Sequence, residues 1–255
     1  MNLLFEYIKY RWKAKGRHGI HSPFIYDFVD KCQRIEFEKD ILEARCTLFT
    51  RLKKDRRKIR VSDFGAGSRK MRKERRVCDI FEIGSSRGKN GLLLYQLSRF
   101  YQPKNILEFG TSLGVGTIHL AIGNPDARIV TVEACKATLD IAIYNFNYLK
   151  INRIKTINSS FTSYLDSEIH GVFDLVFIDG HHDGEALLNY LDRLVPYSHE
   201  ETIFVLDDIR WSDSMFKAYK KIISDDRFHV SIDLFRTGIV MRRKSQRKEH
   251  FVISM

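Results

Sequence analysis

The chain has 255 residues, 44% of them apolar, and it carries 43 Lys and Arg against 32 Asp and Glu, for a formal net charge of +11. That is enough for one sizeable core with an appended helical segment. Four scattered cysteines without a C-x-x-C pair argue against a zinc site and indicate a reducing compartment. No apolar run reaches the length of a membrane span, and the first is too short for a signal peptide. We therefore expect a cytoplasmic protein with no membrane partner.

The positive charge is concentrated at the front of the chain. Residues 1–76 hold 22 Lys and Arg against 10 Asp and Glu, and the remainder is close to neutral. Such asymmetry is typical of proteins with an acidic partner, but it also occurs on surfaces that only favour solubility. Both interpretations stay open at this point.

The first hundred residues predict helices. Apolar spacing predicts helices over 2–14, 23–33 and 40–60, and Ser22 followed by Pro23 is a typical start for the second. His21, in the loop before that helix, is a candidate pocket residue. A strand and Gly turn at 61–68 precede the basic run 69–76, which lacks an apolar face, so we interpret this stretch as a mobile basic loop. A helix over 79–101, interrupted at 84–88, ends before Pro103.

The most informative stretch is Asn105–Gly116. A short apolar strand, Ile106–Phe109, runs into a Gly-rich turn, and a helix with apolar spacing begins at Thr117. Glycine lets the backbone approach a ligand, and a helix N-terminus offers free N–H groups, so the unit predicts a nucleotide site. Its spacing, Glu-x-Gly-x-x-x-Gly, fits neither the dinucleotide fingerprint nor the phosphate loop. Glu108 suits a ligand that carries an ammonium group.

Strands alternate with helices after residue 105. We expect strands near 105–110, 128–133, 154–157, 173–179, 202–207, 228–233 and 238–242, with the last two as a hairpin. Alternating units of this kind predict an α/β fold with a mostly parallel sheet and helices on both faces. Ligands of such sheets bind at the carboxyl ends of the strands.

The Gly turn resembles motif I of the class I S-adenosylmethionine (SAM) methyltransferases. The resemblance implies a Rossmann-like, seven-stranded sheet with an antiparallel last strand and an N-terminal helical extension. Glu133, which ends the second strand about 20 residues after the turn, is expected to accept the ribose hydroxyls. Ser160 is expected to hydrogen-bond the adenine, and Phe161 to stack on it. The resemblance implies the following cofactor-binding residues: Glu108, Gly110, Thr111, Ser112, Gly114, Glu133, Ser160, Phe161 and Asp179.

Two neighbouring strands end in carboxylates, at Asp179 and at Asp207-Asp208. Carboxylates this close repel one another unless a cation or proton intervenes, and oxygen ligands favour Mg²⁺ or Ca²⁺. The segments resemble the metal-dependent catechol and caffeoyl-CoA O-methyltransferases, which implies metal ligation by the three aspartates and a substrate contact by Trp211. Asp208 stands where those enzymes have Asn, and His182 where they have a catalytic Lys. Hydrogen bonding to substrate and helix capping, without metal, is the alternative for Asp207 and Asp208.

The resemblance implies a SAM-dependent methyltransferase acting on the hydroxyl of a small molecule. His182 would be the general base, with Asp179 beside it, because an unperturbed histidine has a pKa near 6.5. The alternatives are a methyltransferase acting on RNA or another acidic macromolecule, and a SAM-binding regulator without turnover. We expect a helical, basic lid over 1–78, the SAM-binding domain over 79–243 and a charged tail over 244–255. Homodimerisation stays open.

Overall fold

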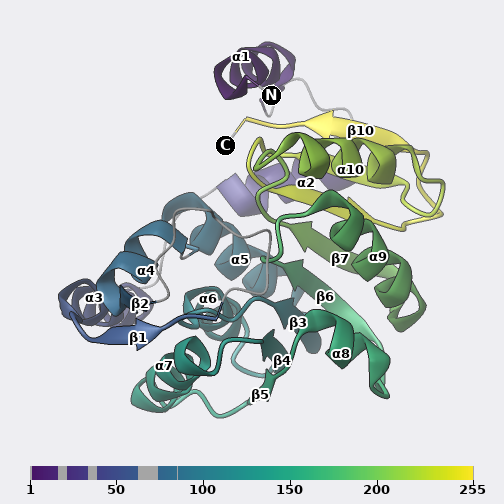
Figure 1. The fold of residues 1–255 in the computed structure, drawn as a ribbon. Helices are drawn as coiled ribbons and strands as arrows, with labels where there is room; N and C mark the ends of the chain where they lie inside the picture. Colours follow the sequence, from purple (N-terminus) through teal and green to yellow (C-terminus); the bar gives the residue numbers. More distant parts are fainter. Residues whose placement is uncertain (1, 17–21, 34–38, 63–73, 85, 255) are drawn as a thin grey trace.

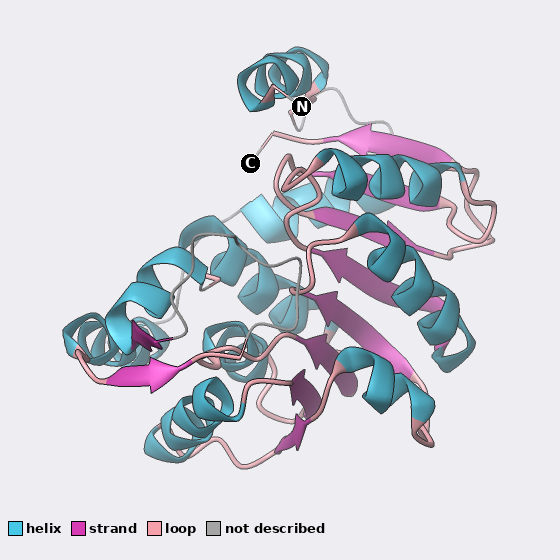
Figure 2. Cartoon of the chain, in the orientation of Figure 1, coloured by secondary structure: helices cyan, strands magenta, loops and turns pink. Residues whose placement is uncertain are grey.

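The computed structural model describes residues 2–16, 22–33, 39–62, 74–84 and 86–254. Helices cover both faces of a twisted central sheet, and a smaller group of elements lies beside one end of it (Figures 1 and 2). The predicted α/β class is confirmed.

Eight strands form the central sheet of the described chain, in the order β10-β8-β9-β7-β6-β3-β4-β5. Most neighbours are parallel, whereas β9 runs antiparallel to both β7 and β8. The strands are β3 (Asn105–Phe109), β4 (Arg128–Glu133), β5 (Ile154–Asn158), β6 (Phe173–Ile178), β7 (Ser198–Leu206), β8 (Val230–Asp233), β9 (Gly238–Met241) and β10 (Glu249–Val252). Seven of them lie where the sequence predicts strands.

The eighth strand corrects the predicted strand count of seven. β10 pairs in parallel with β8, and beyond it Ile253 is buried and donates its backbone N–H to the Asp233 carbonyl. The charged run before β10 hides this strand in the sequence. Phe251 and Ile253 pack against the core beside β8, which favours pairing over a free tail.

Alternate residues of the inner strands face two different cores, as expected for strands buried on both faces. Leu175, Phe177 and Val205 pack against α2 (Pro23–Gln33), α5 (Gly88–Tyr101) and α6 (Val115–Gly123). Val176 and Phe204 pack against α8 (Phe161–Asp166), α9 (Gly184–Leu194) and α10 (Asp213–Ser224). The short 3-10 helix η2 (Val195–Tyr197) connects α9 to β7.

The elements between α2 and α5 form a third cluster beside the sheet. α3 (Lys39–Lys54) and α4 (Val77–Gly84) pack against α6 and α7 (Lys136–Tyr148) through an apolar cluster that contains Leu48, Leu52 and Phe81. The helix predicted over 40–60 is too long. It ends at Lys54, and Lys58–Arg60 forms β1, which pairs with β2 (Glu74–Arg76). Asp55 ends the helix, because its carboxylate accepts the Arg57 backbone N–H and guanidinium.

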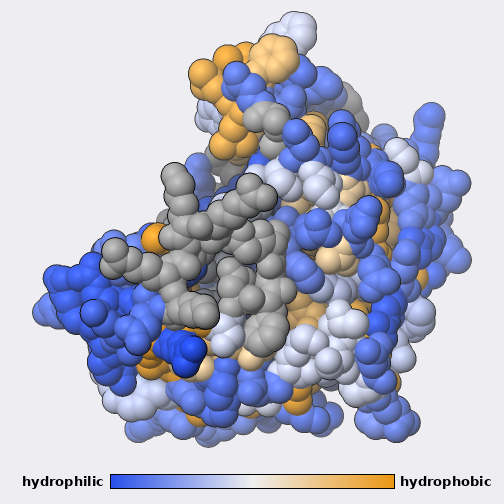
Figure 3. All heavy atoms as spheres, viewed as in Figure 1, coloured by the Kyte–Doolittle hydropathy of each residue, from blue (hydrophilic) through white to orange (hydrophobic). Residues whose placement is uncertain are grey.

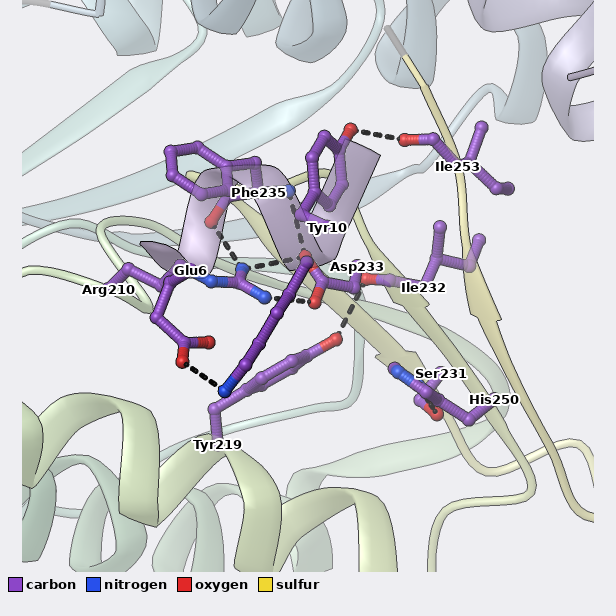
Figure 4. Close-up of polar contacts among 11 residues, drawn as sticks. Glu6, Tyr10, Arg210, Tyr219, Ser231, Ile232, Asp233, Phe235, His250 and Ile253 are labelled. Carbon is purple, nitrogen blue, oxygen red and sulfur yellow. Dashed lines mark hydrogen bonds and ion pairs between the residues drawn. The ribbon is translucent and has the colours of Figure 1, made fainter. Parts of the chain in front are cut away.

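A buried ion pair joins the end of β7 to β8 and to helix α1 (Leu3–Lys13). Arg210 donates to both carboxylate oxygens of Asp233, at 2.8 and 2.5 Å, and to the Phe235 carbonyl at 2.6 Å (Figure 4). The guanidinium lies 5.9 Å from the Tyr10 ring centroid, and Tyr10 of α1 donates its hydroxyl to the Ile253 carbonyl. The pair thus secures the turn after β7 and the place where α1 rests.

We expect Asp233→Asn to destabilise the fold, because it leaves the Arg210 charge buried without a counter-charge. Both side chains are more than nine-tenths buried, so the cost is about 3–5 kcal/mol. The measurement is the free energy of urea unfolding. Asp192→Asn, which breaks an exposed pair with Arg227, is the matched control and should cost about 1 kcal/mol or less. Equal effects of the two substitutions would contradict the assigned role.

Candidate active site

The ends of four parallel strands lie level at one edge of the sheet. Phe109 is in register with Val132 and Ile178, and Ile178 with Leu206. Gly110, Asp179 and Asp207, the next residues along β3, β6 and β7, continue the hydrogen-bond ladder beyond the strands. The side chains predicted from separate motifs are therefore brought to one edge, as expected for ligand sites of parallel sheets.

Two glycines of the turn after β3 have backbone conformations that side chains rarely adopt. Gly110 has a φ of +103°, and a Cβ there would lie 1.8 Å from the Asp179 carbonyl oxygen. Gly114, with a φ of +80°, is the N-cap of α6, and a Cβ there would lie 2.5 Å from the Phe146 ring. Backbone and side-chain atoms thus pack closely against both glycines of the turn. Helix α6 begins where the turn ends and has free N–H groups in its first turn.

The Glu133 side chain is hydrogen-bonded to the turn after β3. Its carboxylate accepts the backbone N–H of Ser112 at 2.8 Å and that of Cys135 at 2.8 Å. Each oxygen retains lone pairs, so the carboxylate can still accept hydroxyl groups of a ligand. Thr111, another predicted contact, is buried, and its hydroxyl lies 2.5 Å from that of Thr131.

Glu108 lies beneath the turn, fully buried. Its Oε2 accepts the hydroxyls of Thr117 and of Thr131, the latter at 2.6 Å, while Oε1 has no hydrogen-bond partner among the described residues. Burial raises the pKa of Glu108 to about 7, the threonine hydrogen bonds oppose this rise, and the Glu133 charge adds to it. The orphaned oxygen is buried against α6, where a Cβ at Gly116 would lie 2.8 Å from it.

The loop after β5 holds the two residues expected beside an adenine. Ser160 is the N-cap of α8, and its hydroxyl accepts the Ser163 backbone N–H at 3.0 Å. The Phe161 ring is stacked on Phe109, with centroids 4.7 Å apart, and it meets Tyr190 edge-on. One face of the Phe161 ring is thus committed to the core.

All three predicted aspartates accept hydrogen bonds from protein donors. Asp207 is 3% exposed and accepts from the amide of Asn90 at 3.1 Å and from the hydroxyl of Thr237 at 3.0 Å. Asp208 accepts from Arg236, whose Nε lies 2.6 Å from Oδ1. Asp179, which is partly buried, accepts from the Ser86 hydroxyl at 3.2 Å.

Sequence reasoning missed all four of these donors. Ser86 lies in the break between α4 and α5, whose glycines were noticed only as a helix interruption, and Asn90 lies in the first turn of α5. Arg236 and Thr237 come from the tight connection between β8 and β9. The hairpin predicted there could have suggested that its residues return to the strand ends.

Crowding raises the pKa values of two of these acids. The pKa of Asp179 lies well above its ordinary value because of burial and the neighbouring charges of Asp207 and Asp208. Burial and the Asp208 charge raise the pKa of Asp207 to about 6, against Arg236 and two hydrogen bonds. Net negative charge is therefore costly at this edge, and a cationic ligand is favoured.

His182 and Trp211 lie beside the aspartates. The His182 Nε2 is 3.8 Å from the Asp208 Oδ2, and the Trp211 ring centroid is 5.2 Å from the His182 ring. His181 instead points to Tyr190, with its Nδ1 2.6 Å from the hydroxyl. His181, His182 and Asp208 all have positive φ values, a strained backbone that is typical of functional sites.

The aspartates as arranged do not fit a preformed divalent-cation site. Asn90, Thr237 and Arg236 engage the oxygens of Asp207 and Asp208, and the guanidinium of Arg236 already supplies a positive charge. Nowhere in the described ranges are three or more His, Cys, Asp or Glu side chains placed to hold a metal ion. Metal ligation by Asp179, Asp207 and Asp208 stays a prediction.

Two predicted features cannot be placed relative to this edge, and one cavity lies apart from it. His21 and the Gly turn at 65–68 lie outside the described residues. A cavity of about 660 Å³ opens between the start of α2 and the segment before β10, lined by residues that include Lys15, Phe24 and Arg243. None of the residues at the strand ends lines that cavity, so it is separate from the candidate site.

The comparisons with known proteins agree with this geometry. Residues 107–209, which contain the Gly turn and all three aspartates, match a family described as a methyltransferase domain. The catechol O-methyltransferase of Mycobacterium tuberculosis is 29% identical over 123 residues, which are 48% of this chain and 55% of that protein. The chain thus spans about half the length of this curated relative.

Solved structures of methyltransferases share the fold. A methyltransferase of Podospora anserina bound to S-adenosylhomocysteine (SAH) is 16% identical, with a TM-score of 0.59, over 88% of this chain and 96% of that chain. An O-methyltransferase of Bacillus cereus in complex with SAH is 19% identical, with a TM-score of 0.58, over 82% of this chain and 94% of that chain. Residues 107–209 are thus similar to a methyltransferase domain, the chain shares the fold of these solved methyltransferases, and the predicted resemblance to the O-methyltransferases is confirmed.

The Glu108 carboxyl should make stability fall as pH rises. Its pKa is about 7 in the fold and 4.5 ordinarily, so the folded chain binds a proton that the unfolded chain releases between these values. This contribution is fully present below about pH 4.5 and is lost as pH rises through 7. Compared with Glu108→Gln, the wild type should lose about 2–3 kcal/mol more unfolding free energy between pH 5 and 8. Parallel pH profiles from urea unfolding would contradict the assignment.

Proposed function

We propose that the chain is a SAM-dependent methyltransferase that acts on a hydroxyl group of a small molecule, with His182 as the general base. The proposal depends above all on one observation. His182, held near Asp208 and beside Trp211, lies at the same strand ends as the Gly turn and Glu133. The name of the curated relative suggests catechols as the first acceptors to test.

The turn residues would hold the cofactor. Glu133 offers carboxylate oxygens to the ribose hydroxyls, the Gly110–Gly114 turn passes close to the methionine half, and Glu108 lies below it with an orphaned oxygen. The loop from Ser160 to Phe161 lies on the side of β5, where the adenine is expected. SAM, when bound, supplies an electrophilic methyl group on a sulfonium.

His182 would prepare the acceptor. Its imidazole would take the proton of the acceptor hydroxyl, so that the oxygen gains nucleophilic character as it attacks. Asp208, 3.8 Å away, stabilises the imidazolium that results, and Trp211 offers an exposed ring against which a flat acceptor can pack. Positioning supplies much of the rate, because two reactants are held in one geometry.

Arg236 would supply the positive charge that a divalent cation supplies in the metal-dependent O-methyltransferases that the strand-end segments resemble. Arg236 belongs to the loop after β8. Its guanidinium donates to the Asp208 carboxylate, and its Nε lies 3.9 Å from the Asp207 Oδ1. A fixed cation at this point lowers the cost of gathering three carboxyl groups and orients Asp208 toward His182.

Replacing His182 should remove turnover without removing cofactor binding. We expect His182→Ala to lower kcat about 10²- to 10⁴-fold with catechol or 3,4-dihydroxybenzoate as acceptor, because the general base is lost. The measurement is SAH formation, together with calorimetric SAH affinity, which should stay within about threefold. His170→Ala, at an exposed histidine, is the control. Undiminished turnover in His182→Ala would indicate that another residue is the general base. A wild-type protein that does not bind SAH would contradict the methyltransferase proposal.

Chelation should leave the wild-type activity unchanged, because Arg236 holds the place of the cation. In Arg236→Gln the aspartates lose this charge, so kcat/KM should fall about tenfold or more and Mg²⁺ should restore part of it. SAH formation is measured with EDTA and with Mg²⁺, and Arg153→Gln, at an exposed arginine, is the control. Wild-type activity that EDTA abolishes and Mg²⁺ restores would instead support the three aspartates as metal ligands.

A further inference from the structure

Helix α1 exposes a row of large apolar side chains. Leu4, Phe5, Ile8 and Trp12 are 69%, 55%, 57% and 90% exposed. Leu4, Ile8 and Trp12 are spaced four residues apart and Phe5 lies next to them, so the four form one face of the helix, called here the α1 stripe. Hydrophobic atoms accordingly gather at the top of Figure 3, where α1 lies in Figure 1. Contiguous exposed apolar surface of this kind marks an interaction site.

The opposite face of α1 is firmly attached to the domain. Tyr7 and Tyr10 pack against Phe235, with ring centroids 5.0 and 5.2 Å apart, and Tyr10 donates to the Ile253 carbonyl at 2.5 Å (Figure 4). Beyond the helix, Lys15 donates its backbone N–H to the Val252 carbonyl at 2.9 Å. The α1 stripe therefore points outward from a helix that is already docked.

Basic residues border the α1 stripe on both sides. At 100° per residue, Lys9 and Lys13 lie beyond the Phe5 side of the stripe and Arg11 lies on its Leu4 side, and Lys15 follows the end of the helix. All four are exposed. Glu6 is the acidic residue of the helix, and it is paired with Lys9 at 3.3 Å. The surface that complements this face is apolar in its centre and acidic around it.

We propose that α1 binds flat on the surface of an anionic lipid bilayer. An amphipathic helix with Trp, Phe and Leu on one face and Lys and Arg beside it places its apolar side chains at the boundary of headgroups and acyl chains, and its cations at the lipid phosphates. Eleven residues span about 16 Å, which suits a helix lying in the interface. No helix of the described chain is long and apolar enough to cross a bilayer.

A second copy of the chain is the less suitable occupant. In a two-fold contact through the α1 stripe, Lys9, Arg11 and Lys13 of one helix would face those of the other, and Glu6 is already engaged. The sequence-based expectation of no membrane partner considered only spanning segments and leader peptides, so it did not cover a surface-bound helix.

Vesicle binding by the full-length chain tests the proposal. We expect it to co-sediment with vesicles of phosphatidylcholine and phosphatidylglycerol, with about tenfold weaker binding to phosphatidylcholine alone or in about 0.5 M NaCl. Ile8→Gln with Trp12→Gln should weaken binding to the anionic vesicles about tenfold or more. Ile83→Gln, at a 72% exposed apolar residue of α4, is the matched control and should bind as the wild type does.

Two controls separate the possible outcomes. Thermal unfolding and SAH affinity of the Ile8→Gln, Trp12→Gln variant should match the wild type, so that lost vesicle binding reflects the stripe rather than misfolding. Sedimentation velocity in the absence of lipid reports on a second copy. A dimer that this variant dissociates, without vesicle binding by the wild type, would overturn the proposal, as would vesicle binding that survives in the variant. None of these outcomes depends on the methyltransferase proposal.

Discussion

The candidate site depends on the gathering of acidic side chains at the carboxyl edge of a parallel sheet. Strands in register end level, so Asp179 and Asp207 arrive side by side after Ile178 and Leu206. Buried carboxylates repel each other and lose hydration, and the raised pKa values of Asp179 and Asp207 express that cost. Hydrogen-bond donors from the surrounding segments offset this cost.

The donors come from segments that are remote in the chain. Ser86 reaches the edge from the break between α4 and α5, and Asn90 from the first turn of α5. Arg236 and Thr237 return to it from the loop between β8 and β9. That loop also carries Phe235, on which α1 rests. The proposed lipid-binding helix and the proposed site therefore both contact one short connection.

Arg236 changes the chemistry expected of the aspartates. A guanidinium is a permanent cation with directed N–H groups, whereas a metal ion also polarises an acceptor oxygen as a Lewis acid. In the arrangement proposed here, proton removal is assigned to His182 and charge balance to Arg236. The strained backbone at His182 and Asp208 holds the two side chains near each other, which the sheet alone would not do.

The amino-acid sequence by itself determined the sheet, the Gly turn and the acidic strand ends. These are local patterns, because apolar alternation, glycine spacing and an acid after a strand are each readable within about ten residues. Only the tertiary structure decided which groups neutralise those acids, because Asn90 and Arg236 lie more than 25 residues from the carboxylates they contact. It likewise decided that residues after a charged run add β10 to the sheet, and that α1 docks through Tyr7 and Tyr10. Pairing between segments that are distant in the chain leaves no periodic pattern in a single sequence. The sequence of a helix likewise does not show which of its faces will dock on the domain.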